Sequence, residues 1–457
     1  MVGEQDVVAS TALRELEADL RGELICPPDS GYDEVRTVFN GMIDRRPLVV
    51  VRCAGASDVV RGITFAREHD LMLSVRGGGH NVAGNAVCDG GLMLDLSGMK
   101  GLRVDPDRRI ARAEPGLTLR ELDHGTQACG LATPLGIVSM TGIAGLTLGG
   151  GLGWLNGRHG LACDNLLSAD IVTADGRLVT ASDEVNPDLF WGIRGGGGNF
   201  GVVTSFEYRL HAVGPVFAGG LSYPLTTAPE VLRFYDDFVK TAPDELSTMA
   251  SLAWSPDGEP VISIVVCYCG PVDAGEQVLR PLRSFRSPLE DSIRPMPYQA
   301  FQSAPDAGFP CGQLHYWKSG WLRHVTHEAI ETMIRFVRQM PSPTTGVGLQ
   351  HLHGAASRVD RSATAFPHRA EQYDFLILSQ WPDAADSTHN IEFTRAFFEA
   401  MQPYLEDSVY VNNLGDEGQG RVQAAYGENY QRLAGLKRKY DPANLFRLNQ
   451  NIEPVID

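Results

Sequence analysis

Long hydrophobic runs and positive charge are both scarce in this sequence of 457 residues. No stretch reaches the roughly 20 consecutive apolar residues that a membrane-spanning helix needs. The N-terminal segment lacks both the basic start and the apolar core of a secretory signal. Lysine and arginine number 39 against 56 acidic residues, and the net charge of -17 repels a phosphate backbone. We therefore expect a soluble, cytoplasmic protein that binds neither membranes nor nucleic acid.

Cysteine is also sparse, because the eight cysteines are scattered and none forms a CxxC pair. This pattern argues against a disulfide framework and against a structural zinc site. Cys267 and Cys269 form a CxC, but the apolar run VISIVVCYCG around them predicts a buried strand. The motifs HLH at 351–353 and HVTHE at 324–328 lack the order and the third ligand that a metal site requires. We predict no metal.

Glycine, in contrast, is abundant: the sequence has 50 glycines, and three glycine-rich runs stand out. They are GGGH at Gly77–His80, GGGLGW at Gly149–Trp154 and RGGGGNFG at Arg194–Gly201. Positions without a Cβ let a large ligand lie against the backbone, and successive N–H groups form concavities suited to a pyrophosphate. We interpret the runs as a dinucleotide site. Tight turns of an irregular β-rich domain are the alternative.

One familiar dinucleotide motif is excluded by its context. Gly196, Gly198 and Gly201 fit the pattern GxGxxG. The Rossmann mechanism needs a strand before this motif and a helix after it. Here NPDLFWGI before the motif predicts a helix, and VVTSFEYRL after it predicts a strand. The order is reversed, so we reject a Rossmann NAD site.

Short strands and helices alternate along the chain. PLVVVRC and LMLSVRG predict two strands joined by a helix with Ser57 as its N-cap, and together they form an α/β unit. Thr118 and Glu121 form a capping-box signal for the next helix, and Asp175 with Gly176 closes a hairpin. Beyond His211 the glycine runs stop, while strands such as YDFLILSQW alternate with helices such as HEAIETMIRFVRQM. This change predicts a second domain.

Five motifs in a fixed order give the sequence a family resemblance. They are RGGGHNVAG, DGGLMLDLSGM, TGIAGLTLGGGLGWLNGRHGLACDNL, NPDLFWGIRGGGGNFGVVTSFEYRL and YDPANLFRLNQNI. Together they resemble the berberine bridge enzyme-like family of FAD-linked oxidoreductases, which have the vanillyl-alcohol oxidase fold. The resemblance implies an α+β protein with a PCMH-type FAD-binding domain of two α/β subdomains, formed by residues 1–211 and 408–457. Residues 212–407 are then an inserted substrate domain, built on an antiparallel sheet covered by helices.

The resemblance implies FAD, bound covalently through the 8α-methyl to His80, because the family's flavin-linked histidine follows the glycines. Many members add a cysteine link in a Gly-x-Cys setting, but here Val138 follows Gly136 and Ile137. We therefore expect a single covalent bond, and Cys163 as a packed small residue. The other residues that the motifs place at FAD are Arg76, Gly77, Gly78, Gly79, Asn81, Gly84, Val138, Thr141, Gly142, Gly145, Gly149, Gly150, Gly151, Gly153, Asp164, Asn165, Gly198, Asn199, Gly201, Val203, Tyr410, Asn412 and Asn449.

The resemblance further implies an oxidase that transfers a hydride from a small organic molecule to flavin N5, with dioxygen as acceptor. The family's base is a tyrosine ending Tyr-x-Asn-Tyr or a glutamate on a strand of the substrate domain. Here Asn413 ends the motif YVNN, and Gln350 is placed where the glutamate is expected. Val82 likewise replaces a tyrosine of some plant members. The usual base is therefore absent.

Other side chains are candidates for the base. The strand period of two in GLQHLHG places His351 and His353 on the face opposite Gln350, and histidine titrates near neutral pH. Tyr316 and Lys318 in QLHYWKSG are further candidates. Together with Asn413 and Gln350, these four complete the expected catalytic set.

Three alternatives stay open at this point. The enzyme is a dehydrogenase that uses another acceptor, or it is a flavin-binding protein with impaired catalysis, or it is a binding module without flavin. The expected substrate is a secondary metabolite or an alkaloid-like molecule, and the sequence leaves its identity and the oligomeric state open.

Overall fold

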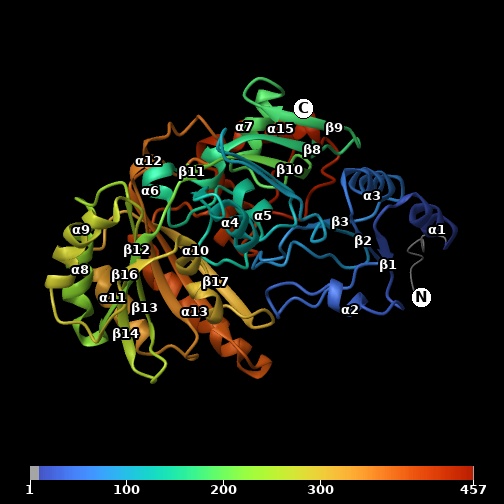
Figure 1. Ribbon diagram of the computed structural model, residues 1–457. Helices are drawn as coiled ribbons and strands as arrows, with labels where there is room; N and C mark the ends of the chain where they lie inside the picture. The colour runs from blue at the N-terminus through green and yellow to red at the C-terminus, as the bar shows by residue number, and fades with distance from the viewer. Residues whose placement is uncertain (1–9, 456–457) are drawn as a thin grey trace.

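The structure is a computed structural model that describes residues 10–455 (Figure 1). The first nine residues, which carry part of the argument against a secretory signal, lie outside the described residues. Within residues 10–455, no helix combines the length and the hydropathy that crossing a membrane requires.

A four-stranded sheet follows the N-terminal helix α1 (Ser10–Asp19). Its strands are, in spatial order, β1 (Glu23–Ile25), β2 (Val49–Arg52), β4 (Leu92–Asp95) and β3 (Leu73–Arg76). β2 and β3 both run parallel to β4, and α3 (Ala56–Glu68) connects β2 to β3, which confirms the predicted α/β unit. The prediction that Ser57 caps α3 is wrong, because Ser57 lies inside the first turn after the N-cap Gly55. The Asp58 carboxylate instead accepts backbone N–H groups of the loop before β1.

A five-stranded antiparallel sheet follows in the chain. Its spatial order is β5 (Leu102–Asp105), β6 (Ile110–Ala113), β10 (Val202–Arg209), β8 (Leu166–Val172) and β9 (Leu178–Ser182). The predicted hairpin is confirmed between β8 and β9, where Gly176 has φ 82°. The predicted capping box of Thr118 and Glu121 begins α4 (Leu119–Gln127). α7 (Pro187–Ile193) precedes the GxGxxG pattern and β10 follows it, so the reversed order is confirmed.

The largest sheet lies between residues 216 and 381 and is antiparallel. Its strands are β12 (Val216–Pro224), β13 (Leu246–Trp254), β14 (Pro260–Tyr268), β15 (Glu290–Asp291), β16 (Arg294–Met296), β17 (Leu314–Leu322), β18 (Gly346–Leu352) and β19 (Gln372–Trp381). The spatial order is β15-β12-β14-β13-β18-β19-β17, with β16 also paired to β12.

Helices cover one face of this sheet (Figure 1). They are α8 (Ala228–Val239), α9 (Val272–Ser284), α11 (His327–Val337) and α13 (Ser387–Met401). On β19, Tyr373, Phe375 and Ile377 belong to the core beneath these helices. The alternate residues of the strand point to the opposite face, which is therefore free to line a site.

The C-terminal segment returns to the N-terminal half (Figure 1). α15 (Tyr430–Tyr440) packs beside α7, and it ends before Asp441 and Pro442. The buried Lys437 ammonium bonds Asp441 and the carbonyl of Asn199, so the tail is attached to the third glycine run. The short helices are α1 (Ser10–Asp19), α2 (Tyr32–Val35), α5 (Ile143–Leu148), α6 (Asn156–His159), α10 (Tyr298–Gln302), α12 (Gly354–Arg358) and α14 (Gln419–Tyr426). The domain boundaries at 211/212 and 407/408 stay a prediction, and the short strand β11 (His211–Ala212), which pairs with β7 (Leu131–Ala132), spans the first of them.

Candidate active site

A cavity of about 1350 Å³ lies between the glycine loops and the free face of the largest sheet. We call its first side the glycine wall, which comprises Gly77–His80, Thr141–Gly149 and Gly197–Gly201 where they line the cavity. We call its second side the sheet wall, which comprises the lining residues of β12, β13, β14, β17, β18 and β19. Each wall contributes a different kind of chemical group.

The glycine wall presents backbone. A Cβ built on Gly78 would lie 2.4 Å from the backbone nitrogen of Gly142, so the first run and the loop before α5 touch backbone to backbone. At Gly145 and Gly198 a Cβ would meet nothing within 4 Å, and both residues line the cavity. A methyl group at either position would occupy cavity volume. This wall therefore fits a large ligand held against bare peptide groups, as the pyrophosphate half of FAD requires.

Tyr410 and Asn412 hold the glycine wall in place from the C-terminal segment. The Tyr410 hydroxyl accepts the N–H groups of Gly151 and Leu152 at 2.9 and 3.3 Å. The Asn412 amide donates to the Tyr410 hydroxyl at 2.8 Å and to the Leu146 carbonyl at 3.0 Å. Both side chains also line the cavity. Burial raises the pKa of the Tyr410 phenol, which therefore stays protonated.

His80 lines the cavity at the end of the first glycine run. Its ring stacks on Phe39, with centroids 3.9 Å apart and planes inclined by 14°. Burial lowers the pKa of His80 to about 4, so the imidazole is neutral at neutral pH. Its Nε2 is buried and has no hydrogen-bond partner among the described residues. A neutral imidazole with an unpartnered nitrogen suits a nucleophile that bonds to a ligand in this cavity.

Asp374 is the buried carboxylate of the sheet wall, and the sequence analysis missed it. Its Oδ2 accepts the Asn413 amide at 2.7 Å, and its Oδ1 accepts the Ser319 hydroxyl at 3.1 Å. Burial raises the pKa of Asp374 to about 6 against the opposing effect of these two hydrogen bonds. One signal was present in QYDFLILSQW, where Asp374 is the charged residue on the face opposite Tyr373 and Phe375.

Two of the six expected catalytic residues line the cavity. Gln350 on β18 pairs in register with Asp374 on β19, so their side chains are neighbours on the same face. Asn413 reaches the cavity from the C-terminal segment, where it donates to Asp374. These two residues and Asp374 form one polar group in an otherwise largely apolar region that includes Leu376 and Leu378.

The structure places the other four candidates outside the cavity. His351 and His353 stack on each other at 4.6 Å, and His351 Nε2 lies 3.3 Å from Glu371. Burial lowers the pKa of His351 to about 3. Alternate residues of a strand lie on opposite faces, and Gln350 lies on the cavity face. His351 and His353 therefore lie on the other face and do not line the cavity.

Tyr316 and Lys318 point to the helix-covered face of β17, since Trp317 between them lines the cavity. The Tyr316 hydroxyl accepts from Arg395 of α13 at 3.2 Å. The Lys318 ammonium pairs with Glu417 at 2.7 Å. Neither side chain is therefore directed into the cavity.

The cavity is also lined by most of the expected FAD-binding residues. These are Gly77, Gly78, Gly79, His80, Asn81, Val138, Thr141, Gly142, Gly145, Gly149, Gly198, Gly201, Val203, Tyr410, Asn412 and Asn449. Arg76, Gly84, Gly150, Gly151, Gly153, Asp164, Asn165 and Asn199 do not line it. Several of these have partners elsewhere, such as Arg76, which pairs with Asp95 at 2.7 Å.

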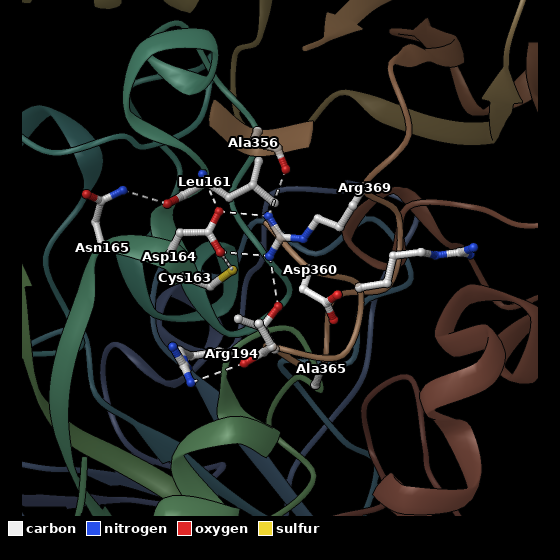
Figure 2. A network of polar contacts seen from close by, with 12 residues as sticks. Leu161, Cys163, Asp164, Asn165, Arg194, Ala356, Asp360, Ala365 and Arg369 are labelled. Atoms are coloured by element: carbon white, nitrogen blue, oxygen red, sulfur yellow. Dashed lines mark hydrogen bonds and ion pairs between the residues drawn. The ribbon is translucent and has the colours of Figure 1, made fainter. Parts of the chain in front are cut away.

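Asp164 forms a buried ion pair with Arg369 (Figure 2). The guanidinium donates to both carboxylate oxygens, at 2.8 and 2.7 Å, and also to Thr364 and the Ala356 carbonyl. Arg369 precedes β19 and Asp164 precedes β8, so the pair joins the segment before a strand of the largest sheet to the segment before a strand of the five-stranded sheet. Cys163 beside it is fully buried in the main hydrophobic cluster, as expected for a packed small residue.

Comparisons with known proteins agree with this geometry. Residues 47–182 match a family model described as an FAD binding domain, and residues 409–453 match one described as berberine and berberine like. An FAD-linked oxidoreductase of Dictyostelium discoideum is 33% identical over 460 residues, which cover 100% of both chains. The (R)-6-hydroxynicotine oxidase of Paenarthrobacter nicotinovorans is 30% identical over 95% of this chain and 97% of its own. The crystal structure of 6-hydroxy-D-nicotine oxidase from Arthrobacter nicotinovorans superposes with a TM-score of 0.88 at 30% identity, covering 95% of this chain and 98% of that one.

The fold and the matches define a flavin-dependent oxidoreductase with a PCMH-type FAD-binding domain. More particularly, the chain belongs to the berberine bridge enzyme-like family of FAD-linked oxidoreductases.

Proposed function

We propose that this protein is an FAD-dependent oxidase, with one covalent flavin link at His80, that oxidises a small organic molecule and uses dioxygen as acceptor. The observation that carries the proposal is one cavity lined by both His80 and the buried carboxylate Asp374. Bound FAD supplies a two-electron acceptor for a hydride from the substrate. The chain's own residues then have to hold the substrate and take its proton.

Asp374 is the proposed proton acceptor for an O–H or N–H group of the substrate. Its pKa of about 6 leaves it ionised at neutral pH, and a base with a pKa near the working pH is effective. Asn413 and Ser319 hold the two oxygens of this carboxylate, which limits its rotation. The Gln350 amide beside it on β18 is the proposed hydrogen-bonding partner that orients the substrate.

A single covalent link is supported by the cysteines. Val138 lines the cavity where other family members carry the second linking residue, and it has no thiol. Among residues 10–455, no cysteine lines the cavity. All eight cysteines are free, which also supports the proposed location in a reducing compartment such as the cytoplasm.

The charge of the cavity supports a neutral or cationic substrate of the secondary-metabolite or alkaloid type. Among the lining residues that the structure describes, Arg294 is the one permanent cation, and it is exposed. Asp374 places negative charge beside the reacting region at neutral pH. An anionic substrate would therefore be repelled by the Asp374 carboxylate, and no buried cation among the described lining residues would pair with it.

The covalent link is tested by acid precipitation of the purified protein. We expect the yellow flavin to remain in the wild-type pellet, and a His80→Ala variant to release it to the supernatant. Flavin in the supernatant of the wild type would refute the link. A second flavin-bearing peptide in a proteolytic map would refute the single bond.

The oxidase activity is tested by reducing the flavin anaerobically with compounds from a substrate screen and then mixing it with aerated buffer. Reoxidation well under a second is expected of an oxidase. Recovery over minutes would instead support a dehydrogenase that uses another acceptor. If no compound in the screen bleaches the flavin, the result favours the impaired flavoprotein.

A further inference from the structure

Residues 39–41 bridge the two walls of the cavity, and we call them the bridging segment. The Phe39 N–H donates to the carbonyl of Gly79, directly before His80, at 3.0 Å. On the other side, the Gly312 N–H donates to the Phe39 carbonyl at 3.1 Å, and the Gly41 N–H donates to the Gln313 carbonyl at 2.8 Å. The segment is therefore bonded both to the glycine run and to the residues that lead into β17.

Asn40 fixes the same segment with its side chain, which is 2% exposed. Its amide nitrogen donates to the carbonyls of Val82 at 2.8 Å and His315 at 3.0 Å. Its amide oxygen accepts the His315 N–H at 3.0 Å. Val82 follows His80 by two residues, so the bonds of Phe39 and Asn40 reach both sides of His80 in the chain.

The Phe39 ring is enclosed between two imidazoles. It stacks on His80 at 3.9 Å and on His315 at 4.3 Å, with planes inclined by 14° and 24°. Trp317 closes one edge at 6.3 Å. Burial lowers the pKa of His315 to about 4, and neither of its ring nitrogens has a partner in the described chain. His315 therefore supports the stack as a neutral aromatic ring.

The orientation of the His80 ring needs such a support. Three glycines precede it, and because they lack a Cβ they give the loop little intrinsic stiffness; Gly79 adopts φ +66°. The χ2 torsion of histidine has broad, shallow minima. Because Nε2 has no hydrogen-bond partner among the described residues, no bond from that atom sets the plane of the ring. The ring forms a hydrogen bond with the backbone of His80 itself, and the contact with another residue that constrains its plane is the stack on Phe39.

We propose that Phe39 is a positioning residue for the flavin link, holding the His80 imidazole in the plane from which it bonds to the 8α-methyl of FAD. This rests on the covalent link of the proposed function. Forming the bond joins an imidazole nitrogen to the methyl carbon and removes one hydrogen from each. They leave as two protons and two electrons, and dioxygen receives the electrons by way of the flavin. Misplacing a reacting group by about 1 Å can cost on the order of 100-fold in rate.

The test compares Phe39→Leu with Phe39→Tyr in the full-length protein as purified and after incubation with FAD in air. The fraction of flavin that survives acid precipitation is measured over time. We expect attachment in Phe39→Leu to slow by about tenfold or more, with FAD still bound non-covalently, and Phe39→Tyr to attach at a rate near the wild type. Phe375→Leu is the matched control, since Phe375 is also buried, 0% exposed against 4% for Phe39, but lies in the core beneath the helices.

The outcomes separate this inference from the proposed function. A wild type that releases all its flavin refutes the covalent link itself. If Phe39→Leu attaches flavin at the wild-type rate, this inference is refuted and the proposed covalent link is not. The inference is also refuted if Phe375→Leu slows attachment as much as Phe39→Leu does. If Phe39→Leu does not accumulate as folded protein, Asn40→Ala is measured instead, because it loosens the bridging segment and leaves the Phe39 ring intact. Attachment at the wild-type rate in Asn40→Ala would then overturn the proposal.

Discussion

The two walls of the cavity are built from different parts of the polypeptide. The glycine wall offers peptide groups, and its important feature is the absence of side chains at positions such as Gly145 and Gly198. The sheet wall offers side chains on a regular antiparallel scaffold, and its important feature is one buried carboxylate, Asp374. This difference predicts a division of labour. Changes in the glycine wall should affect cofactor binding, and changes in the sheet wall should affect turnover with the cofactor still bound.

The largest effect is expected from Asp374→Asn, which removes the proposed base while keeping its shape. We expect turnover to fall by about 10²–10⁴-fold, because that is the usual contribution of a general base. The flavin content should equal that of the wild type, since the glycine wall is untouched. Steady-state kinetics and the flavin-to-protein ratio give the two values. Wild-type turnover in this variant would show that the sheet wall does not supply the base.

The next effect concerns the buried ion pair of Asp164 and Arg369, which lies outside both walls. Asp164→Asn leaves the Arg369 guanidinium buried without its charge partner, and breaking such a pair costs about 3–5 kcal/mol of unfolding free energy. Urea unfolding measures the change. Asp244→Asn is the matched control, because Asp244 also pairs with an arginine, Arg358, but both side chains are exposed. The control should lose less than about 1 kcal/mol. Equal losses would show that burial does not decide the strength of the Asp164 pair.

A smaller effect is expected in the glycine wall, and it concerns cofactor binding rather than turnover. In the His80→Ala background, where FAD binds without the covalent link, Gly145→Ala places a methyl group in the cavity, and we expect the dissociation constant of FAD to rise about tenfold, which corresponds to about 1.4 kcal/mol. The fraction of protein that does carry flavin should turn over as the His80→Ala parent does. Gly435→Ala is the control, because Gly435 also lies in a helix with open space around it, but away from the cavity. Unchanged FAD affinity in Gly145→Ala would mean that this backbone does not contact the cofactor.

The smallest effect is a displacement of the pH profile. Asp374 must be ionised to accept a proton, so wild-type turnover should rise with pH through about 6. The Asn413 hydrogen bond stabilises the ionised form and lowers the pKa, so Asn413→Leu should raise the pKa and move the profile to higher pH, by about one unit. Ser319→Ala should move it in the same direction. If the pH profile of turnover stays in place or moves to lower pH, the group whose titration controls turnover is not Asp374.

The sequence predicted the glycine wall well and the sheet wall poorly. The glycine runs, His80 and the C-terminal residues Tyr410 and Asn412 were found because short motifs carry them, and all of these line the cavity in part or in full. The strand period also placed His351 opposite Gln350 correctly. It gave no indication of which face of the strand would be covered by helices, and four candidates were therefore assigned to the site although they lie outside it.

Asp164 illustrates the same limit. A motif placed it near FAD, but its carboxylate pairs with Arg369, which lies 205 residues away in the chain. Asp374 and Ser319 are 55 residues apart, and Phe39 meets His315 only because the N-terminal segment crosses to β17. None of these contacts has a local signature.

The sequence by itself determined the features that neighbouring residues encode: strand and helix periods, the capping box of Thr118, and the Cβ-free loops ending at His80. Backbone conformation and its steric limits act over a few residues, so they can be recognised from a short motif. Only the tertiary structure decided which carboxylate is buried beside the cavity, which face of each strand forms its wall, and which ring supports the His80 imidazole. Burial and the pKa values that follow from it depend on segments brought together from distant parts of the chain.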